Sequence, residues 1–433
     1  MNSAGKTTLL GIQHLLAMYA GAVIVPLIVG KELGLTNEQL TYLVAIDILM
    51  CGVATILQIM SNRVFGIGLP VVLGCTFTAV GPIIQIGQDF GITSIYGAII
   101  VSGLFVVVVS RFFGMLVKFF PPVVTGTVVT IIGVTLIPVA INNAGGGQGE
   151  PDFGSLTNLA LAFGTLLLII LVYKFSTGFL RAIAILIGLL VGTLVAISLN
   201  MVDFTPVKEA SYFHMMQPFY FGMPTFHWPA ILTMILVAMV SLVESTGVYF
   251  ALGDICEKDI KQKDLEKGYR AEGIAVLLGG IFNSLPYTTF SQNVGLLQMS
   301  GVRSRRVIFV TGVMLITLGF VPKIAAIAMI IPTSVLGGAM IAMFGMIVSQ
   351  GVKMLGATFA ASEENPMIIA VSVGIGLGVT VAPEIFANLP KSLQMFTSNG
   401  IVAGSLTAIL LNIIFNMIPG FKKGQEKSSE QGI

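Results

Sequence analysis

The sequence predicts an all-α polytopic membrane protein with fourteen transmembrane segments, arranged as two inverted repeats of seven. Three observations lead to this prediction. Hydrophobic residues make up 55% of the 433 positions and charged residues only 10%, and the mean hydropathy is +0.96, which excludes a soluble domain. Apolar stretches of about 20 residues, each able to cross a bilayer, recur along the chain. Short motifs recur between its two halves.

The apolar stretches give seven candidate spans in each half of the chain. Those of the first half cover residues 8–29, 39–60, 66–87, 93–113, 122–142, 156–173 and 179–199. Those of the second half cover residues 229–252, 271–285, 288–301, 306–321, 327–350, 366–382 and 398–418. The ninth and tenth candidates are short, and we expect the third and the tenth to be broken helices.

The positions of Lys and Arg support this count, because cytoplasmic segments of membrane proteins carry an excess of them. If the amino terminus is cytoplasmic, all 22 Lys and Arg residues fall on the cytoplasmic side except Lys31, Lys208, Lys323 and Lys391. A wrong number of spans in mid-chain would mix the two sides. We therefore predict fourteen spans in the plasma membrane, with both termini in the cytoplasm.

Two pairs of motifs relate the two halves. Thr76-Phe77-Thr78 in the third span matches Thr289-Phe290-Ser291 in the tenth at an offset of 213 residues. Gly126 in the fifth span matches Gly338 in the twelfth at an offset of 212, and a second glycine pair seven residues later keeps that offset. An odd number of spans per repeat places the two copies in opposite orientations. This is the plan of secondary transporters, which bind substrate near the midplane, where paired broken helices face each other.

The tenth candidate span and its flanks, Pro286 to Arg303, carry the clearest functional signal. Its first part, Tyr287 to Phe290, is aromatic and β-branched, which favours extended backbone. Unpaired strand backbone cannot face lipid, so this segment should line a cavity within the protein. Gln292 and Asn293 add side-chain amides that both donate and accept hydrogen bonds. The segment predicts a binding wall for a small polar solute; the alternative is a polar loop between two spans.

Four ionisable side chains fall inside spans, where a carboxylate costs roughly 2.5 to 3.5 kcal/mol on insertion scales. Glu244 lies in the middle of the eighth span without a cationic residue nearby in sequence, so we expect it to bind solute or a proton. Glu272 and His14 are further candidates for proton coupling. Their structural alternatives are an ion pair between Glu272 and Arg270 and a packing role for His14. For Asp47 in the second span we favour a structural role.

Other kinds of site find little support. Cys51, Cys75 and Cys256 have neither metal-site nor disulfide spacing. No cluster of nucleophile, base and orienting residue is evident, so we do not expect an enzyme. We expect no metal and no cofactor, with H+ as the coupling ion, and no nucleic-acid partner.

The run from Gln292 to Gly301 resembles the signature of the nucleobase-ascorbate transporters, the nucleobase:cation symporter family. That signature is Gln or Glu, Asn, any residue, Gly, four residues, then Thr or a similar residue. Gln13-His14, Thr76-Phe77-Thr78 and Glu244 are also similar to positions of that family, and the resemblance spans essentially the whole chain. It implies proton-coupled uptake of a nucleobase by a membrane-embedded protein that is often a homodimer.

The resemblance also implies a division of the spans into two domains. The core domain would comprise residues 1–113 and 229–323, which hold spans 1–4 and 8–11. The gate domain would comprise residues 114–228 and 324–418, and residues 419–433 would form a cytoplasmic tail. Short antiparallel strands in spans 3 and 10 would cradle the substrate.

The resemblance further implies roles for single residues. The family's residue at the position of Glu244 binds ring nitrogens of the base, and the one at Gln292 also contacts it. Glutamine there is similar to the xanthine and urate members rather than to the uracil members. The chemistry agrees, because an oxopurine presents N–H donors and carbonyl acceptors, and aromatic rings can stack on it. The expected substrate site comprises Glu244, Gln292, Phe77, Thr76, Phe290, Ser291 and Asn293.

Two departures from the family pattern bear on the mechanism. Val248 stands one turn after Glu244, where many members carry histidine or aspartate, and Ser300 replaces the usual threonine. The valine argues against a proton relay through that position and leaves Glu244, Glu272 and His14 as candidates. The alternatives are a symporter for uracil or another nucleobase and a sulfate or bicarbonate transporter of the same architecture, although a midplane glutamate suits an anion poorly.

Overall fold

The computed structural model describes residues 4–113, 119–356, 358–359, 362–390, 393–394 and 397–418. Lys391 and the predicted tail, residues 419–433, lie outside the described residues. The chain forms two compact units. The first comprises residues 1–114 and 136–346, and the second comprises residues 115–135 and 347–433.

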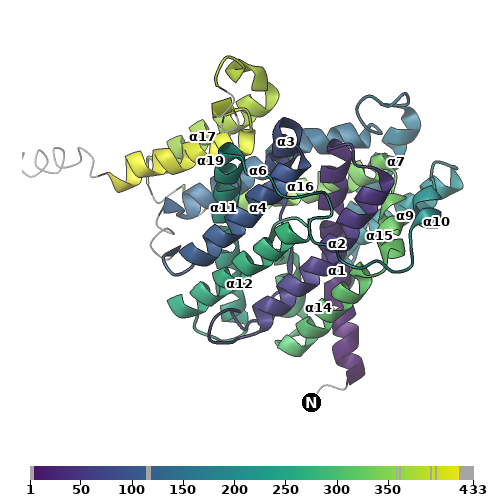
Figure 1. Cartoon of the computed structure of the whole chain (residues 1–433), viewed down its shortest axis with the longest axis horizontal. Coiled ribbons are helices and arrows are strands. Elements are labelled where there is room, and N and C mark those ends of the chain that lie inside the picture. Colours follow the sequence, from purple (N-terminus) through teal and green to yellow (C-terminus); the bar gives the residue numbers. More distant parts are fainter. Residues whose placement is uncertain are drawn as a thin grey trace, which may run out of the picture. The chain divides into compact units, whose positions relative to one another are not determined.

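Helices dominate the described part of the chain (Figure 1). Those of the first unit are α1 (Ala4–Glu32), α2 (Asn37–Ile59), α3 (Val80–Phe90), α4 (Ile92–Val109), α7 (Leu156–Phe175), α8 (Gly178–Ala182), α9 (Ala184–Ser198), α10 (Thr205–Glu209), α11 (Trp228–Ile255), α12 (Gln262–Ile281), α13 (Ser291–Ser300), α14 (Arg305–Gly319) and α15 (Pro322–Met329). The second unit contains α17 (Asn365–Val381) and α19 (Gly400–Asn412), and α6 (Pro122–Ala144) and α16 (Thr333–Gly356) contribute to both units.

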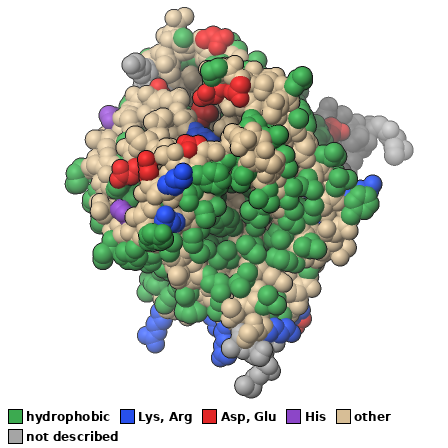
Figure 2. Space-filling model, turned by 90° about the vertical axis from the view of Figure 1, so that its right-hand side faces the viewer, with side chains coloured by type: hydrophobic (Ala, Val, Ile, Leu, Met, Phe, Trp, Pro, Cys, Tyr) green, Lys and Arg blue, Asp and Glu red, His purple; other side chains and the backbone are tan. Residues whose placement is uncertain are grey.

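Eight helices of the described residues are long and apolar enough to cross a membrane: α1, α2, α4, α6, α7, α11, α16 and α19 with its π-helical extension. Helices α14 and α15 form a further candidate that is bent by 82°. Side chains such as Phe163 and Leu167 of α7 are exposed, as lipid-facing residues must be. Figure 2 shows hydrophobic side chains gathered over a broad area of the surface. The protein is therefore a multi-span helical membrane protein.

Two predicted boundaries differ from the structure. The predicted twelfth span, 327–350, begins inside α15, because Pro332 lacks an N–H and separates α15 from α16. The predicted ninth span begins at residue 271, whereas α12 begins at Gln262. Its first turns are highly charged, and hydropathy marks only the apolar part of a helix.

The predicted strands are present in both broken segments. Strand β1 (Leu73–Cys75) pairs antiparallel with β2 (Tyr287–Thr289), and Gly74 lies opposite Thr288. The hydroxyl of Thr55 on α2 accepts a hydrogen bond from the Leu73 N–H at 3.0 Å. All six strand residues are buried, so their backbone does not face lipid.

A helical segment follows each strand directly. A 3-10 turn, η1 (Phe77–Ala79), leads from β1 into α3, and the Thr76 hydroxyl caps it by accepting from the Thr78 N–H at 3.2 Å. Helix α13 begins right after β2 without a side-chain cap and ends at Gly301, whose φ of 64° suits a glycine. The helix amino termini are therefore adjacent to the strand pair, where their N–H groups can serve a ligand's acceptors.

Candidate functional site

The predicted substrate residues come together around the strand pair. Helix α11, which carries Glu244, packs against η1, β2 and α13. Thr76 and Phe290 are the residues that follow β1 and β2. Gln292 lies in the first turn of α13 and Phe77 in η1. The fold therefore joins segments that are more than 200 residues apart in sequence.

Glu244 and Gln292 are the accessible polar side chains of this group. Glu244 is half-buried, and both Ser291 and Gln292 are exposed. Among the described residues, neither Glu244 nor Gln292 has a side-chain hydrogen-bond partner. Their polar atoms are therefore available to a ligand. A carboxylate that accepts and an amide that both donates and accepts match the edge of an oxopurine.

The two aromatic residues at the strand ends have different surroundings. Phe290 is only 5% exposed, because its ring packs against glycines of α1 and β1. A Cβ atom at Gly21 would lie 2.7 Å from Phe290 Cε1, and one at Gly74 would lie 2.3 Å from Cε2. Phe77 is half-buried, and its ring makes an edge contact with Phe344 of α16 at 6.0 Å between centroids. Phe77 is thus the more accessible ring for stacking.

Glu272 is 2% exposed and belongs to a hydrogen-bond network beside the strands. Ser245 Oγ donates to Glu272 Oε2 at 3.1 Å, and the Tyr249 hydroxyl donates to Oε1. Ser245 also accepts from the backbone N–H of Thr289 at 3.4 Å, which links this carboxylate to β2. Arg270, the predicted alternative partner of Glu272, instead pairs with Glu266.

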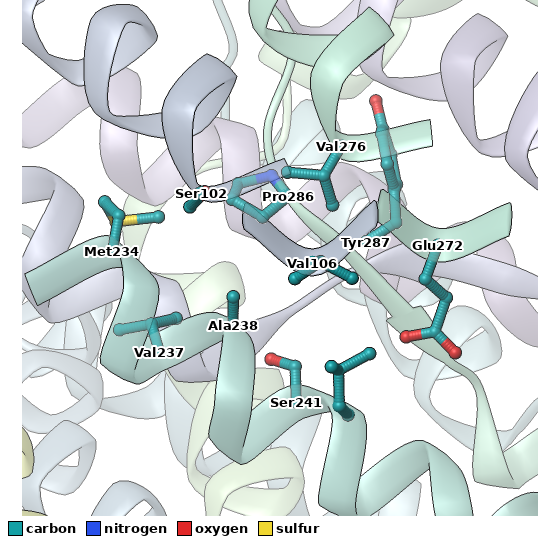
Figure 3. Close-up of a pocket in the computed structure, with 11 residues that line it drawn as sticks. Ser102, Val106, Met234, Val237, Ala238, Ser241, Glu272, Val276, Pro286 and Tyr287 are labelled. Carbon is teal, nitrogen blue, oxygen red and sulfur yellow. The ribbon is translucent and has the colours of Figure 1, made fainter. Parts of the chain in front are cut away.

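A small cavity of about 20 Å³ borders Glu272 (Figure 3). Most of its lining is apolar, including Val106, Val237 and Val276, and Ser241 contributes a hydroxyl. Ser241 Oγ is buried without a hydrogen-bond partner within the described part of the chain. The cavity has room for about one water molecule and is too small for a nucleobase.

His14 and Asn293 lie together, away from the accessible amide of Gln292. Asn293 Nδ2 is 3.1 Å from His14 Nδ1 and donates to the His14 carbonyl oxygen at 2.9 Å. Both side chains are 3% exposed. The pair fastens α13 to α1, which is the packing role considered for His14.

Asp47 also joins two segments. It is fully buried, and its Oδ1 accepts from Ser284 Oγ at 2.9 Å and from the Leu285 N–H at 3.2 Å. These contacts tie α2 to the segment that leads into β2. This arrangement agrees with the structural role favoured for Asp47.

Sequence reasoning missed several residues of this region. Ser245 could have been found, because it is polar and adjacent to Glu244. Tyr249 and Gln58 carry no such signal, because their importance depends on Glu272, which is distant in sequence. Phe344 is one apolar residue in an apolar helix, and only its contact with Phe77 distinguishes it.

Comparison with known proteins identifies the family. Residues 5–385 match the sequence model of the Permease family, which contains the xanthine and uric acid permeases. This chain belongs to that family. The predicted resemblance to nucleobase-ascorbate transporters is thereby confirmed, and the permease is a transporter rather than an enzyme.

Two curated relatives and one solved structure show the extent of the similarity. The permease is 61% identical over 427 residues to the xanthine permease of Bacillus subtilis, covering 99% of this chain and 98% of the relative. It is 58% identical over 414 residues to the uric acid permease PucK of the same organism, covering 96% of each. The transmembrane domain of the cyanobacterial bicarbonate transporter BicA has the same fold, with a TM-score of 0.61 and 16% identity, over 94% of this chain and 97% of that one.

Proposed function

We propose that this permease takes up a purine nucleobase, xanthine in the first place and urate next, in symport with protons. The observation that carries the proposal is the pair Glu244 and Gln292, which is accessible beside the ends of two paired strands. The relatives at 61% and 58% identity are named as permeases for xanthine and uric acid, respectively.

The proposed binding mode uses each group once. Glu244 accepts hydrogen bonds from ring N–H groups, and Gln292 both donates and accepts. Backbone N–H groups at the start of η1 and α13 serve the carbonyl oxygens, since a helix amino terminus favours negative partial charge. Phe77 stacks on the ring, and Phe344 limits the space beside it.

For proton coupling we propose Glu272 together with Glu244. Two carboxylates on neighbouring helices, neither of which forms a salt bridge with a described residue, are expensive to keep charged in a membrane. Proton uptake at this pair would permit the loaded core domain to move. His14 is the weaker candidate, because Asn293 already engages it.

The proposed architecture has fourteen spans in two inverted repeats, with core domain 1–113 and 229–323, gate domain 114–228 and 324–418, and both termini cytoplasmic. The antiparallel pairing of β1 with β2 supports it, because inverted repeats bring equivalent broken segments together. We further propose a homodimer embedded in the lipid of the plasma membrane.

Uptake of radiolabelled xanthine into cells that express the permease tests the proposal. We expect uptake that a protonophore abolishes and that unlabelled urate inhibits. Unlabelled guanine, uracil and sulfate serve as further competitors. Uracil transport without xanthine transport would keep the family but overturn the interpretation of Gln292, and sulfate exchange would overturn the substrate class.

A further inference from the structure

A chain of hydrogen bonds leads from strand β2 through Glu272 to helix α2. It begins at Thr289, whose backbone N–H and hydroxyl donate to Ser245 Oγ at 3.4 and 3.2 Å. Ser245 and Tyr249 donate to the two oxygens of Glu272, and Gln58 Nε2 of α2 donates to the Tyr249 hydroxyl. Each of these five side chains is at most 2% exposed. The chain is therefore shielded from solvent along its length.

Gln58 fixes the direction of these hydrogen bonds. Its Oε1 accepts from the Ile67 N–H at 3.1 Å, and its Nε2 also donates to the Gly268 carbonyl oxygen at 3.0 Å. Because the amide oxygen is occupied by a backbone donor, only the NH₂ group can face Tyr249. A hydroxyl that accepts from Gln58 has its own proton available for Glu272. Gln58 thus makes Tyr249 a donor toward the carboxylate.

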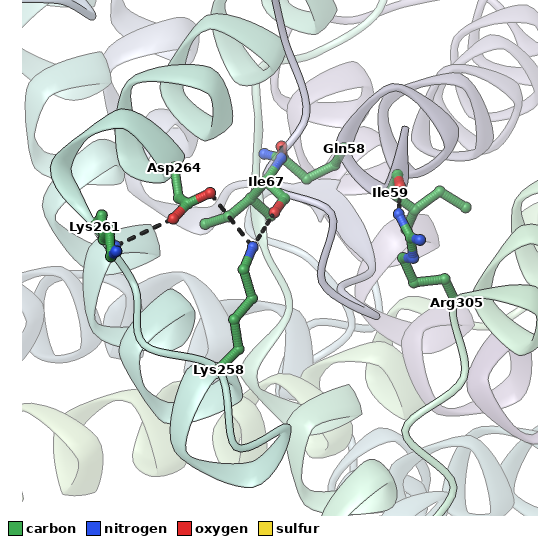
Figure 4. A network of polar contacts seen from close by, with 7 residues as sticks. All are labelled: Gln58, Ile59, Ile67, Lys258, Lys261, Asp264 and Arg305. Atoms are coloured by element: carbon green, nitrogen blue, oxygen red, sulfur yellow. Dashed lines mark hydrogen bonds and ion pairs between the residues drawn. The ribbon is translucent and has the colours of Figure 1, made fainter. Parts of the chain in front are cut away.

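The segment that orients Gln58 is itself held by cations (Figure 4). Lys258 Nζ donates to the Ile67 carbonyl oxygen at 3.1 Å and lies 3.4 Å from Asp264 Oδ1. Arg305 Nη1 donates to the Ile59 carbonyl oxygen at 3.3 Å. Hydrogen bonds from charged donors are stronger than neutral ones. Gln58 is therefore anchored to a braced segment between α2 and β1.

We propose that Gln58 and Tyr249 are positioning residues for proton-coupled transport. They hold the Glu272 carboxylate against Ser245, and through Ser245 against strand β2, so that a change at the carboxylate is transmitted to the substrate site. The inference rests on the proposed function, because it takes Glu272 to exchange a proton during each transport cycle.

Two transport modes separate this role from a general structural one. Exchange of xanthine for xanthine moves the loaded protein in both directions, so the coupling carboxylate can keep its proton throughout. Accumulation against a gradient requires the carboxylate to release and rebind the proton in every cycle. A positioning residue for Glu272 should affect accumulation more than exchange, whereas a residue needed only for folding should affect both equally.

The experiment uses the full-length permease in proteoliposomes with radiolabelled xanthine. Tyr249→Phe and Gln58→Leu are compared with Tyr269→Phe, a matched control. Tyr269 is also buried, but its hydroxyl bonds to Thr246 at 2.6 Å. In the two test variants we expect proton-driven accumulation to fall by about tenfold or more, as for the loss of a hydrogen bond to a charged group. Exchange should be retained, and the control should keep both modes.

The double variant adds a second criterion. Because both residues act through one carboxylate, Gln58→Leu combined with Tyr249→Phe should lose no more accumulation than the more severe single variant. Thermal unfolding verifies that each variant is folded, and Gln58→Met replaces the leucine variant if that one does not fold.

The outcomes separate the two ideas. Parallel loss of exchange and accumulation, additive losses in the double variant, or an equal effect of Tyr269→Phe would overturn the positioning role. If the unmodified permease exchanges xanthine but never accumulates it under an imposed proton gradient, the proposed proton coupling is wrong. If it transports no oxopurine at all, the proposed substrate is wrong.

Discussion

Glu244 and Glu272 are the same type of residue on neighbouring helices, yet their surroundings differ. Glu244 is half-buried, and its carboxylate has no hydrogen-bond partner among the described residues. Glu272 is 2% exposed and accepts hydrogen bonds from Ser245 and Tyr249. A carboxylate with free acceptor sites can take up a ligand without losing existing bonds. On this ground we propose ligand binding at Glu244 and proton coupling at Glu272.

The substitution Glu244→Gln tests the first assignment. It removes the charge that strengthens hydrogen bonds from the ring N–H groups, so we expect the KM for xanthine to rise by about tenfold or more. Radiolabelled uptake at several xanthine concentrations measures the change. The control is Glu257→Gln, because Glu257 is exposed and the hydrogen bond from Arg303 only lowers its pKa. Unchanged KM in the Glu244 variant would show that Glu244 does not contact the base.

The close contact of Gly74 with Phe290 gives a prediction about stability. In Gly74→Ala, the new methyl group would lie 2.3 Å from Phe290 Cε2, which the ring can relieve only by moving. We expect a destabilisation of about 1–3 kcal/mol, as for other overpacked cores. Thermal unfolding in detergent measures it. Gly295→Ala is the control, because a Cβ atom there has no neighbour within 4 Å. Equal unfolding temperatures of the two variants would contradict the tight packing.

At the scale of elements, the strand pair depends on contacts from several helices. Thr55 of α2 bonds to β1, Asp47 of α2 bonds to the segment before β2, and Ser245 of α11 bonds to β2. Two strands of three residues are too short to be stable alone. The site geometry is therefore set by these surrounding helices.

Asp47 provides the test at this scale. Asp47→Ala leaves the Ser284 hydroxyl and the Leu285 N–H buried without this acceptor, at a cost of about 1–3 kcal/mol for each unpaired group. We expect lower thermal stability and weaker xanthine binding. Asp47→Asn keeps an oxygen at the position of Oδ1 and should lose less of both. Equal losses in the two variants would mean that the negative charge, and not the acceptor, is important.

At the scale of the whole molecule, the distribution of positive charge predicts the orientation in the membrane. Lys208 is expected outside and Lys263 inside, and both side chains are exposed. Cys51 and Cys75 are buried, so replacement of the half-exposed Cys256 by serine gives a background with little labelling.

In that background, a membrane-impermeant thiol reagent applied to intact cells should label Lys208→Cys but not Lys263→Cys. After permeabilisation, both variants should be labelled. The opposite pattern would invert the topology, and labelling of both positions in intact cells would mean that the number of spans between them is wrong.

The sequence by itself determined the class of the protein, the two broken segments and the residues that begin the candidate site. These follow from local properties: hydropathy over about 20 residues marks spans, and β-branched and aromatic residues at 287–290 mark a strand. The positions of Glu244 and Gln292 followed from the same reasoning, since polar groups in apolar spans stand out.

Only the tertiary structure decided how these residues are used. It placed Asn293 against His14, packed Phe290 against Gly21 and Gly74, and connected Glu272 to Tyr249. Each of these contacts joins segments that lie far apart in sequence or a side chain to one particular neighbour. Hydropathy and motif spacing carry no information about which atoms meet, because that depends on how the helices pack against one another.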